Sequence, residues 1–191
     1  MIEAQQRYDS APTDWTPDAT SVTDFDAAID HVLQVTTHIA RDLIGAHQSA
    51  ATMIVGGDWK TIRNYFSLSP KYSQWFDYHT PAVGYGIHAL VVAENKPIRL
   101  TQAQLQAHPE WKGFGAEAYK HPPMRGWLAV PVIGWDNRNY GLLQVSDKYD
   151  DAEFTADDEL RFVRLAQLTA KALEGIWALV DNHPLDSPHS H

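Results

Sequence analysis

The N-terminal third of the chain contains one long stretch with helical spacing of its apolar residues. From Phe25 to Ile44 apolar side chains recur every three or four positions, which is typical of a helix with one buried face. Gly45 follows directly, and glycine is the residue that most often ends a helix. The pattern therefore predicts an amphipathic helix that starts at about Asp24 and ends near Gly45.

A second long stretch with the same spacing lies near the C-terminus. Apolar residues recur at helical intervals from Leu160 to Leu179. Thr155 precedes this run, and Asp158 follows Thr155 by three residues, close to the capping-box pattern that starts many helices. We predict a helix that is capped by Thr155 and ends at about Asp181.

Shorter apolar runs between these helices have the character of strands. Residues 50–55 and 61–68 read as two strands joined by a turn. Residues 127–133 and 140–146 are almost entirely apolar, and the polar residues 136–139 separate them. This is the clearest hairpin in the chain, and its continuous apolar character predicts a central place in a sheet.

The middle of the chain is less regular. Residues 86–94 and 102–108 favour short helices, the second capped by Thr101, and residues 97–100 favour a short strand. The element order predicts an α+β fold: an antiparallel sheet of five or six strands flanked by helices, with long N- and C-terminal helices.

Composition narrows the class of protein. The 191 residues are 44% hydrophobic and include no cysteine, which excludes disulfide scaffolds, thiol catalysis and cysteine-bound metal. The net charge of −9, with scattered basic residues, disfavours binding to nucleic acid or to an anionic membrane. No apolar run is long enough to span a bilayer, and the polar, acidic start is unlike a secretory signal, so we expect a cytoplasmic protein.

The two ends of the chain have little apolar patterning. Residues 1–22 are rich in Pro, Asp, Ser and Thr and are interpreted as a flexible leader, and residues 182–191 as a disordered tail. Residues 23–181 then form one domain. We expect no catalytic or DNA-binding output domain beside it, so a signal would leave through a partner.

Two motifs in the C-terminal half resemble a known family. One is the segment His-Pro-Pro-Met-Arg-Gly-Trp that begins at His121, and the other is Asp147-Lys148 followed by Phe154 and Asp158-Glu159. Together with the hairpin they resemble a GAF domain, most closely the HPPM type of bacterial sensor histidine kinases. The resemblance covers about residues 24–180 and implies an antiparallel sheet flanked by helices that senses a small molecule. A shared fold does not fix the ligand.

The resemblance, together with residue chemistry, suggests a ligand site around the HPPM motif. The prolines after His121 stiffen its backbone, which suits a ligating or switching imidazole. Gln144 can hydrogen-bond a small polar ligand. The candidate ligand-binding residues are His121, Met124, Trp127, Gln144, Trp111, Phe114 and Tyr85.

Haem is an alternative ligand. The resemblance to haem-binding GAF domains implies His121 as the proximal iron ligand, in an apolar slot made by the aromatic residues. One difference opposes this assignment, because Gln144 stands where that subgroup has a distal tyrosine. The alternative interpretation is that His121 caps a helix end, so the cofactor stays open.

The second motif resembles a degenerate form of the Asn-Lys-X-Phe-Asp-Glu signature of cyclic-nucleotide-binding GAF domains. Asp147 stands where the signature has asparagine, and the spacing is longer. Because Lys148 ends a strand and Asp158 begins a helix, we expect an ion pair between them that joins the two elements. This structural role is favoured over recognition of a cyclic nucleotide.

The predicted function is non-catalytic sensing of a small molecule. An enzyme is a further hypothesis, because some small GAF proteins are reductases, but this chain lacks the cysteines that their chemistry needs. A structural interaction module, whose pocket is filled by its own side chains, is another. The family resemblance implies a partner, a histidine kinase or another signalling protein. Surplus apolar positions on the terminal helices, such as Trp177 and Leu179, suggest a homodimer through these helices, although they could also pack within one chain.

Overall fold

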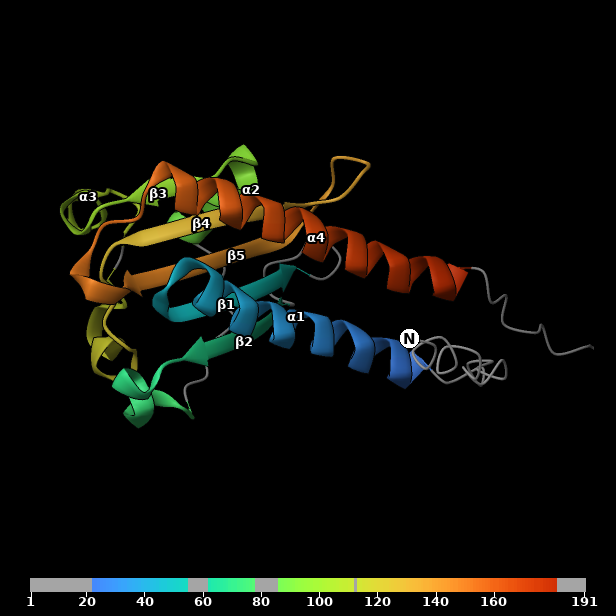
Figure 1. Ribbon diagram of the computed structural model, residues 1–191, viewed down its shortest axis with the longest axis horizontal. Helices are drawn as coiled ribbons and strands as arrows, with labels where there is room; N and C mark the ends of the chain where they lie inside the picture. The colour runs from blue at the N-terminus through green and yellow to red at the C-terminus, as the bar shows by residue number, and fades with distance from the viewer. Residues whose placement is uncertain (1–21, 55–61, 78–85, 112, 182–191) are drawn as a thin grey trace, which may run out of the picture.

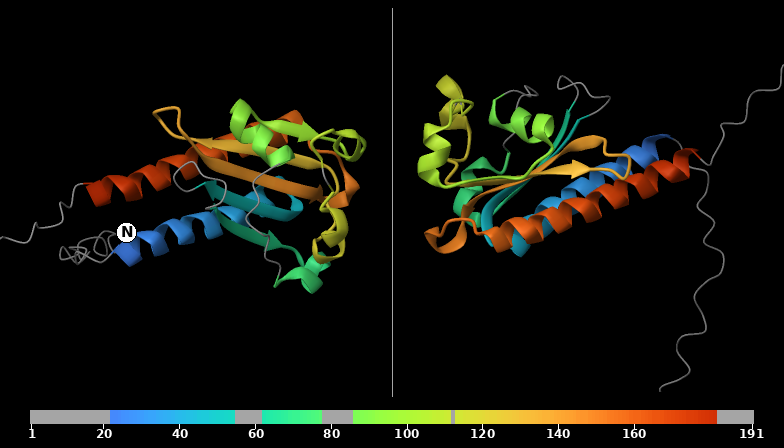
Figure 2. Two further views of the ribbon diagram at one scale, coloured as in Figure 1. Left: turned by 180° about the vertical axis from the view of Figure 1, so that it is seen from behind. Right: turned by 90° about the horizontal axis from the view of Figure 1, so that it is seen from above.

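The computed structural model describes residues 22–54, 62–77, 86–111 and 113–181 (Figure 1). Most of the predicted leader and the predicted tail lie outside these ranges. A five-stranded sheet stands at the centre, with two long helices on one face and short helices on the other (Figure 2). The helices are α1 (Val22–Ile44), α2 (Ile87–Glu94), α3 (Gln102–Ala107) and α4 (Ala156–Asp181), with short 3-10 helices η1 (Pro70–Trp75), η2 (Gly115–Lys120) and η3 (Tyr149–Asp151).

The helix ends follow the predicted signals. Gly45 follows α1 with a φ of +69°, a conformation that glycine adopts without steric cost. The capping box before α4 is present: the Asp158 carboxylate accepts from the Thr155 backbone N–H at 2.7 Å, and the Thr155 hydroxyl accepts from the Asp158 N–H at 3.2 Å. Thr101 and Gln104 form the same reciprocal pair at the start of α3.

All five strands are antiparallel to their neighbours, in the order β2-β1-β5-β4-β3. The predicted hairpin is the pair β4 and β5, and β5 is the central strand, as its continuous apolar character indicated. The bounds are β1 (Ala46–Ile54), β2 (Ile62–Leu68), β3 (Ile98–Leu100), β4 (Trp127–Ile133) and β5 (Asn139–Lys148).

One strand starts earlier than predicted. The apolar run placed the first strand at residue 50, but β1 begins at Ala46 and includes polar residues. These residues find partners that an apolar pattern cannot reveal. Ser49 donates to the Thr37 carbonyl on α1, and Gln48 donates to the Pro123 carbonyl at 2.7 Å.

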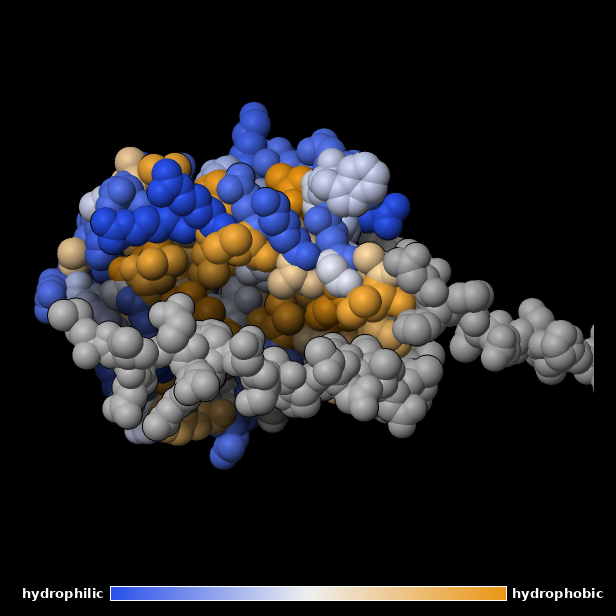
Figure 3. Space-filling view, turned by 45° about the vertical axis from the view of Figure 1, so that its right-hand side comes forward, coloured by the Kyte–Doolittle hydropathy of each residue, from blue (hydrophilic) through white to orange (hydrophobic). Residues whose placement is uncertain are grey.

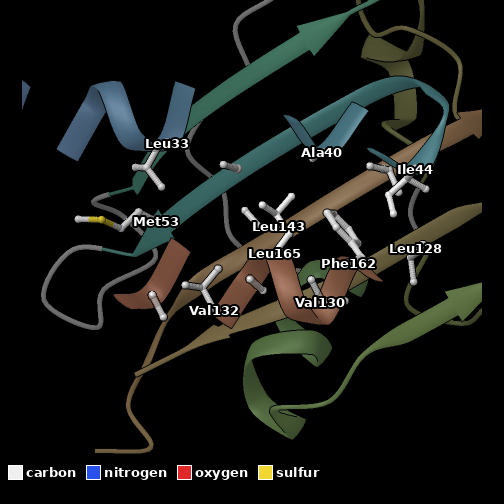
Figure 4. Close-up of a cluster of buried hydrophobic side chains, with 14 of the residues drawn as sticks. Leu33, Ala40, Ile44, Met53, Leu128, Val130, Val132, Leu143, Phe162 and Leu165 are labelled. Atoms are coloured by element: carbon white, nitrogen blue, oxygen red, sulfur yellow. The ribbon is translucent and has the colours of Figure 1, made fainter. Parts of the chain in front are cut away.

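The main core lies between the sheet and the pair α1 and α4 (Figure 4). The two helices run side by side over one face of the sheet. The right-hand view of Figure 2 shows the sheet edge-on, with these helices on one side of it. Alternate strand residues such as Leu143 and Val145 point into this core. Buried residues that Figure 4 labels there are Leu33, Ala40, Ile44, Met53, Leu128, Val130, Val132, Leu143, Phe162 and Leu165.

The opposite face of the sheet carries a smaller apolar cluster under α2 and α3. The cluster contains Trp127, Ala129 and Leu142 from the strands and Ile87 and Val91 from α2. The strand register aligns Ala129 with Gln144, so Gln144 belongs to the same face. We call it the α2 face: the side of the sheet that bears Ile98, Trp127, Ala129, Leu142, Gln144, Ala50, Thr52, Asn64 and Phe66.

None of the described helices is long and apolar enough to cross a membrane.

Candidate functional site

A partly buried group of three polar side chains lies at the α2 face. The Gln144 side-chain oxygen accepts from the indole N–H of Trp127 at 2.8 Å, and it lies 2.8 Å from Nε2 of His88. Trp127 is fully buried on β4, Gln144 is in the middle of β5, and His88 is in the first turn of α2. The group therefore joins two strands to the helix above them.

The chemistry of Trp127 fixes the orientation of the other two side chains. An indole N–H can only donate, so the oxygen of the Gln144 amide must face it. Because His88 Nε2 meets the same oxygen, Nε2 carries a proton and donates. Burial lowers the pKa of His88, and the bond to Gln144 opposes this only in part, so the ring is neutral at pH 7 and its Nδ1 is an acceptor.

The residues predicted around the HPPM motif form a continuous aromatic array beside this group. Trp111 and Met124 pack against the cluster that contains Trp127. Phe114 meets Trp111 edge-on, with ring centroids 5.4 Å apart, and stacks on His121 at 3.9 Å with the rings 8° from parallel. The structure thus brings the predicted residues together, except Tyr85, which lies outside the described residues.

His121 is held by its own chain. Its side chain is buried, with 7% of the residue exposed, and one ring face is covered by Phe114. The backbone after it is tied down as well, because the Pro123 carbonyl accepts from Gln48 at 2.7 Å and from the Tyr72 hydroxyl at 3.4 Å. The His121 ring is therefore held in place by the protein itself.

Two polar residues of the α2 face were missed by sequence reasoning. His88 is the one ionisable residue in the apolar run from Ile87 to Ala93, and this was its signal. Asn64 stands between Ile62 and Phe66 on the same side of β2, and its Oδ1 is buried without a hydrogen-bond partner. A buried amide oxygen without a partner costs free energy.

A second polar cluster closes one end of the sheet around Asp147. This residue is completely buried, and its carboxylate accepts from Tyr72 at 2.6 Å and from Lys71 at 2.5 Å. Asp147 has a φ of +57°, and this left-handed residue reverses the alternation of β5. Lys148 therefore turns towards α4 and forms an ion pair with Asp158, so the two motif residues meet between strand and helix.

The comparisons with known proteins agree with this geometry. A family model described as "GAF domain" matches residues 26–174, which is most of the chain. The chain belongs to the GAF domain family.

Solved structures of GAF domains share the fold at low sequence identity. The GAF domain of a phosphoenolpyruvate-protein phosphotransferase from Coxiella burnetii is 18% identical, with a TM-score of 0.62 over 84% of this chain and 92% of that one. The second GAF domain of DevS from Mycobacterium smegmatis is 15% identical, with a TM-score of 0.59 over 81% and 99%. At this identity the likeness shows the fold and leaves the ligand open.

An enzyme is also among the similar structures. The type II free methionine-R-sulfoxide reductase from Thermoplasma acidophilum is 15% identical, with a TM-score of 0.59 over 80% of this chain and 97% of that one. The present GAF domain contains no cysteine, so any thiol chemistry on this fold is unavailable to its own residues.

The described residues of this GAF domain do not fit haem. His121 stacks on Phe114, and the Gln144 oxygen already takes two hydrogen bonds from protein donors.

The Lys148–Asp158 pair predicts a pH dependence of stability. Burial would raise the pKa of Asp158, but hydrogen bonds from Lys148 and Thr155 outweigh it, and the net pKa is below the ordinary value. A carboxylate with a lowered folded-state pKa stabilises the fold above the unfolded-state pKa, at about pH 4, and loses this contribution as the pH falls through the folded-state pKa. We expect Asp158→Asn to be less stable than the parent above pH 4, and the difference to shrink in more acidic solution.

Urea unfolding of both proteins between pH 7 and pH 3 measures this difference. The matched control is Asp157→Asn, because Asp157 is the neighbouring residue and pairs with Arg161 on the exposed surface. It should change stability by less than about 0.5 kcal/mol at every pH. An Asp158→Asn deficit that stayed constant down to pH 3 would contradict the proposed cause.

Proposed function

We propose that this chain is a non-catalytic sensory GAF domain that binds a small molecule on its α2 face. The observation that carries the proposal is the group formed by Gln144, Trp127 and His88, a set of directed hydrogen bonds on an otherwise apolar wall. Apolar walls with a few convergent polar groups are the usual form of small-molecule sites. The aromatic array from His121 to Trp111 lies at the edge of the same wall.

The central strand β5 connects this site to the two long helices. Gln144 faces α2, while its neighbours Leu143 and Val145 are buried against α1 and α4 on the other side of β5. A ligand that shifts β5 therefore acts on the packing of both long helices. We infer that ligand binding favours one of two packings of α1 and α4, which is a population shift.

The experiment is native mass spectrometry and an absorption spectrum of freshly purified protein. We expect a retained small molecule, released on denaturation, and its loss from a Gln144→Leu variant that still folds by circular dichroism. The proposal would be overturned if the protein carried no bound mass and if the NMR signals of Trp127 and His88 responded to no member of a metabolite set. A Soret band would contradict the conclusion that the described residues do not fit haem.

The partner is proposed from the HPPM motif. The His121-Pro-Pro-Met segment supports an assignment to the HPPM type of GAF domain, and with it a sensor histidine kinase or another signalling protein as the receiver of the signal. Co-purification from cells that contain such kinases, with and without the ligand, tests this partner.

The outer surface of α1 and α4 supports a homodimer. Val35, Ile39 and Leu43 are exposed and four residues apart, so they form a stripe along α1. Leu168 and Leu179 are exposed on α4 and eleven residues apart, which is three helical turns. Figure 3 shows hydrophobic side chains gathered in a band across this side of the molecule, with hydrophilic ones above. We propose that a second copy covers this band.

Charged substitutions in the band should separate the two copies. Ile39 is 47% exposed and Leu168 is 64% exposed, so the double variant Ile39→Glu and Leu168→Glu leaves the monomer core intact. We expect light scattering at tens of micromolar to give the dimer mass for the parent and half that mass for the variant. Phe76→Glu is the control, because Phe76 is an exposed aromatic outside both helices. A parent that is monomeric at this concentration would contradict the dimer.

A further inference from the structure

The outer faces of α1 and α4 carry charges of opposite sign beside the hydrophobic band. Asp42 lies seven residues after Val35, and therefore on the same side of α1, and its side chain is 67% exposed. Arg164 and Lys171 lie four residues before and three residues after Leu168, so they flank it on α4, and both are exposed. Within the described part of the chain neither of these two cations has an ion pair. These charges are thus available to a second copy.

The other described charged side chains of the two helices already have partners. Arg41 pairs with Asp42 at 3.3 Å, but its guanidinium also donates to the Leu68 carbonyl at 2.8 Å, so it is held towards β2. The remaining pairs are Asp26 and Asp30 with Arg63, Asp157 with Arg161, Asp158 with Lys148, Glu159 with Arg99, and Glu174 with the Tyr140 hydroxyl. Among the described side chains, the charges left at the band are therefore Asp42 on α1 and Arg164 and Lys171 on α4.

One contact defines the heights of the two helices relative to each other. The helices run in opposite directions (Figure 1), and the hydroxyl oxygens of Thr36 and Thr169 lie 3.3 Å apart between them. Arg164 precedes Thr169 by five residues, and Asp42 follows Thr36 by six. Their heights along the helices therefore differ by one residue, or about 1.5 Å. The cation on α4 and the acid on α1 are almost level.

The apolar residues of the band are level in the same way. Leu168 directly precedes Thr169, so it has the height of residue 37 on α1. This height lies between Val35 and Ile39, which are 39% and 47% exposed. If α4 of one copy lies antiparallel to α1 of another at equal heights, Leu168 is placed between these two apolar side chains, as in ordinary helix packing.

Two-fold symmetry allows two ways to bring these faces together. A two-fold axis parallel to the helices lays α1 of each copy on α4 of the other and keeps every height. A two-fold axis perpendicular to the helices, in the plane of the interface, lays α1 on α1 and α4 on α4. The second arrangement would set Arg164 and Lys171 against the same basic surface of the other copy. Because like charges repel, the charge pattern favours the first arrangement.

We propose that two copies associate about a two-fold axis parallel to the long helices, so that α1 of each copy lies on α4 of the other. Arg164 pairs with the partner's Asp42, and Leu168 lies between the partner's Val35 and the partner's Ile39. The proposal rests on the homodimer proposed above and names its contacts. Each α4 then packs on two α1 helices, its own and the partner's. A change in the packing of α1 and α4 within one copy therefore changes the interface with the other.

Charge reversal tests the ion pair on the full chain. Asp42→Arg and Arg164→Asp each set like charges against each other at both symmetric pairs. We therefore expect either variant to raise the dissociation constant of the dimer about tenfold. The combined variant restores opposite charges and has the net charge of the parent, so its constant should return to within about threefold of the parent value. Sedimentation equilibrium at low ionic strength measures these constants.

Asp77→Arg is the matched control for Asp42→Arg. Asp77 is an exposed acid that follows η1, outside both long helices, and the substitution changes the net charge by the same amount. It should leave the dissociation constant within about threefold of the parent value. A combined variant that dimerises as weakly as the two single variants would overturn the proposed ion pair.

Disulfide cross-linking tests which helices meet. The chain contains no cysteine, so each introduced cysteine reports on one position. We expect mild oxidation of a mixture of Val35→Cys and Leu168→Cys to cross-link the two chains, and either variant alone to cross-link much more slowly. Faster cross-linking of Leu168→Cys alone would place α4 on α4 and overturn the arrangement, while the homodimer would stand. A parent that is monomeric by light scattering would overturn the homodimer itself, and this arrangement with it.

Discussion

Gly141→Ala is expected to destabilise the fold by more than about 4 kcal/mol, which is a large part of the stability of an ordinary domain. Gly141 lies on β5, and its φ of +143° is one that side chains rarely allow. A β-carbon there would stand 1.9 Å from the carbonyl oxygen of Thr52 on β1. Because that oxygen belongs to the backbone of a paired strand, relief requires β1 and β5 to separate. Urea unfolding followed by circular dichroism measures the loss.

Gly175→Ala is the matched control for this substitution. Gly175 is exposed on α4, and no atom lies within 4 Å of the position its β-carbon would take. Alanine in a helix interior is more favourable than glycine by about 0.5–1 kcal/mol, so this variant should be slightly more stable than the parent. If both variants lost the same stability, the close approach of β1 to Gly141 would not be the cause.

Local signals were sufficient to predict most of the secondary structure. The capping box at Thr155 and Asp158 and the glycine after α1 act within a few residues, so they can be recognised without knowledge of the fold. The central position of β5 was also predictable, because a strand buried on both faces needs apolar residues at nearly every position.

The start of β1 and part of the site depend on contacts between distant segments. His47 and Gln48 are polar, and their hydrogen bonds to Ser69 and Pro123 offset the free-energy cost of removing them from water. Gln144 was predicted as a ligand-binding residue, but its hydrogen bond to His88 joins residues 56 positions apart. A sequence pattern shows that His88 is unusual in an apolar helix, and it cannot show which side chain it meets.

The two faces of the sheet give the proposed sensing and the proposed signalling separate places in one small domain. Each of the three inner strands sends alternate side chains to the main core and to the smaller apolar cluster on the α2 face. The exception is at Asp147, where the left-handed residue turns Lys148 towards α4. This reversal ties the end of β5 to α4 close to the HPPM segment.

Asp147→Ala is expected to lower the free energy of unfolding by about 3 kcal/mol. The carboxylate accepts from Tyr72 and Lys71, and the Tyr72 hydroxyl, in a buried residue, would lose its short bond. Burial and the bond to Asp147 raise the pKa of Tyr72, so the hydroxyl stays protonated and needs an acceptor. Alanine also tolerates the φ of +57° poorly, at a cost of about 1 kcal/mol. Thermal and urea unfolding measure the sum.

Asp147→Asn separates the two contributions and decides the cause. Asparagine adopts a positive φ more readily than alanine, and its amide oxygen can still accept from Tyr72, so only the charge opposite Lys71 is lost. Because Lys71 is 44% exposed, water can solvate it, and we expect a loss of about 1 kcal/mol. Equal losses for Asp147→Ala and Asp147→Asn would assign the whole effect to the ion pair. A much smaller loss for Asp147→Asn would make Asp147 chiefly a hydrogen-bond acceptor and a turn residue.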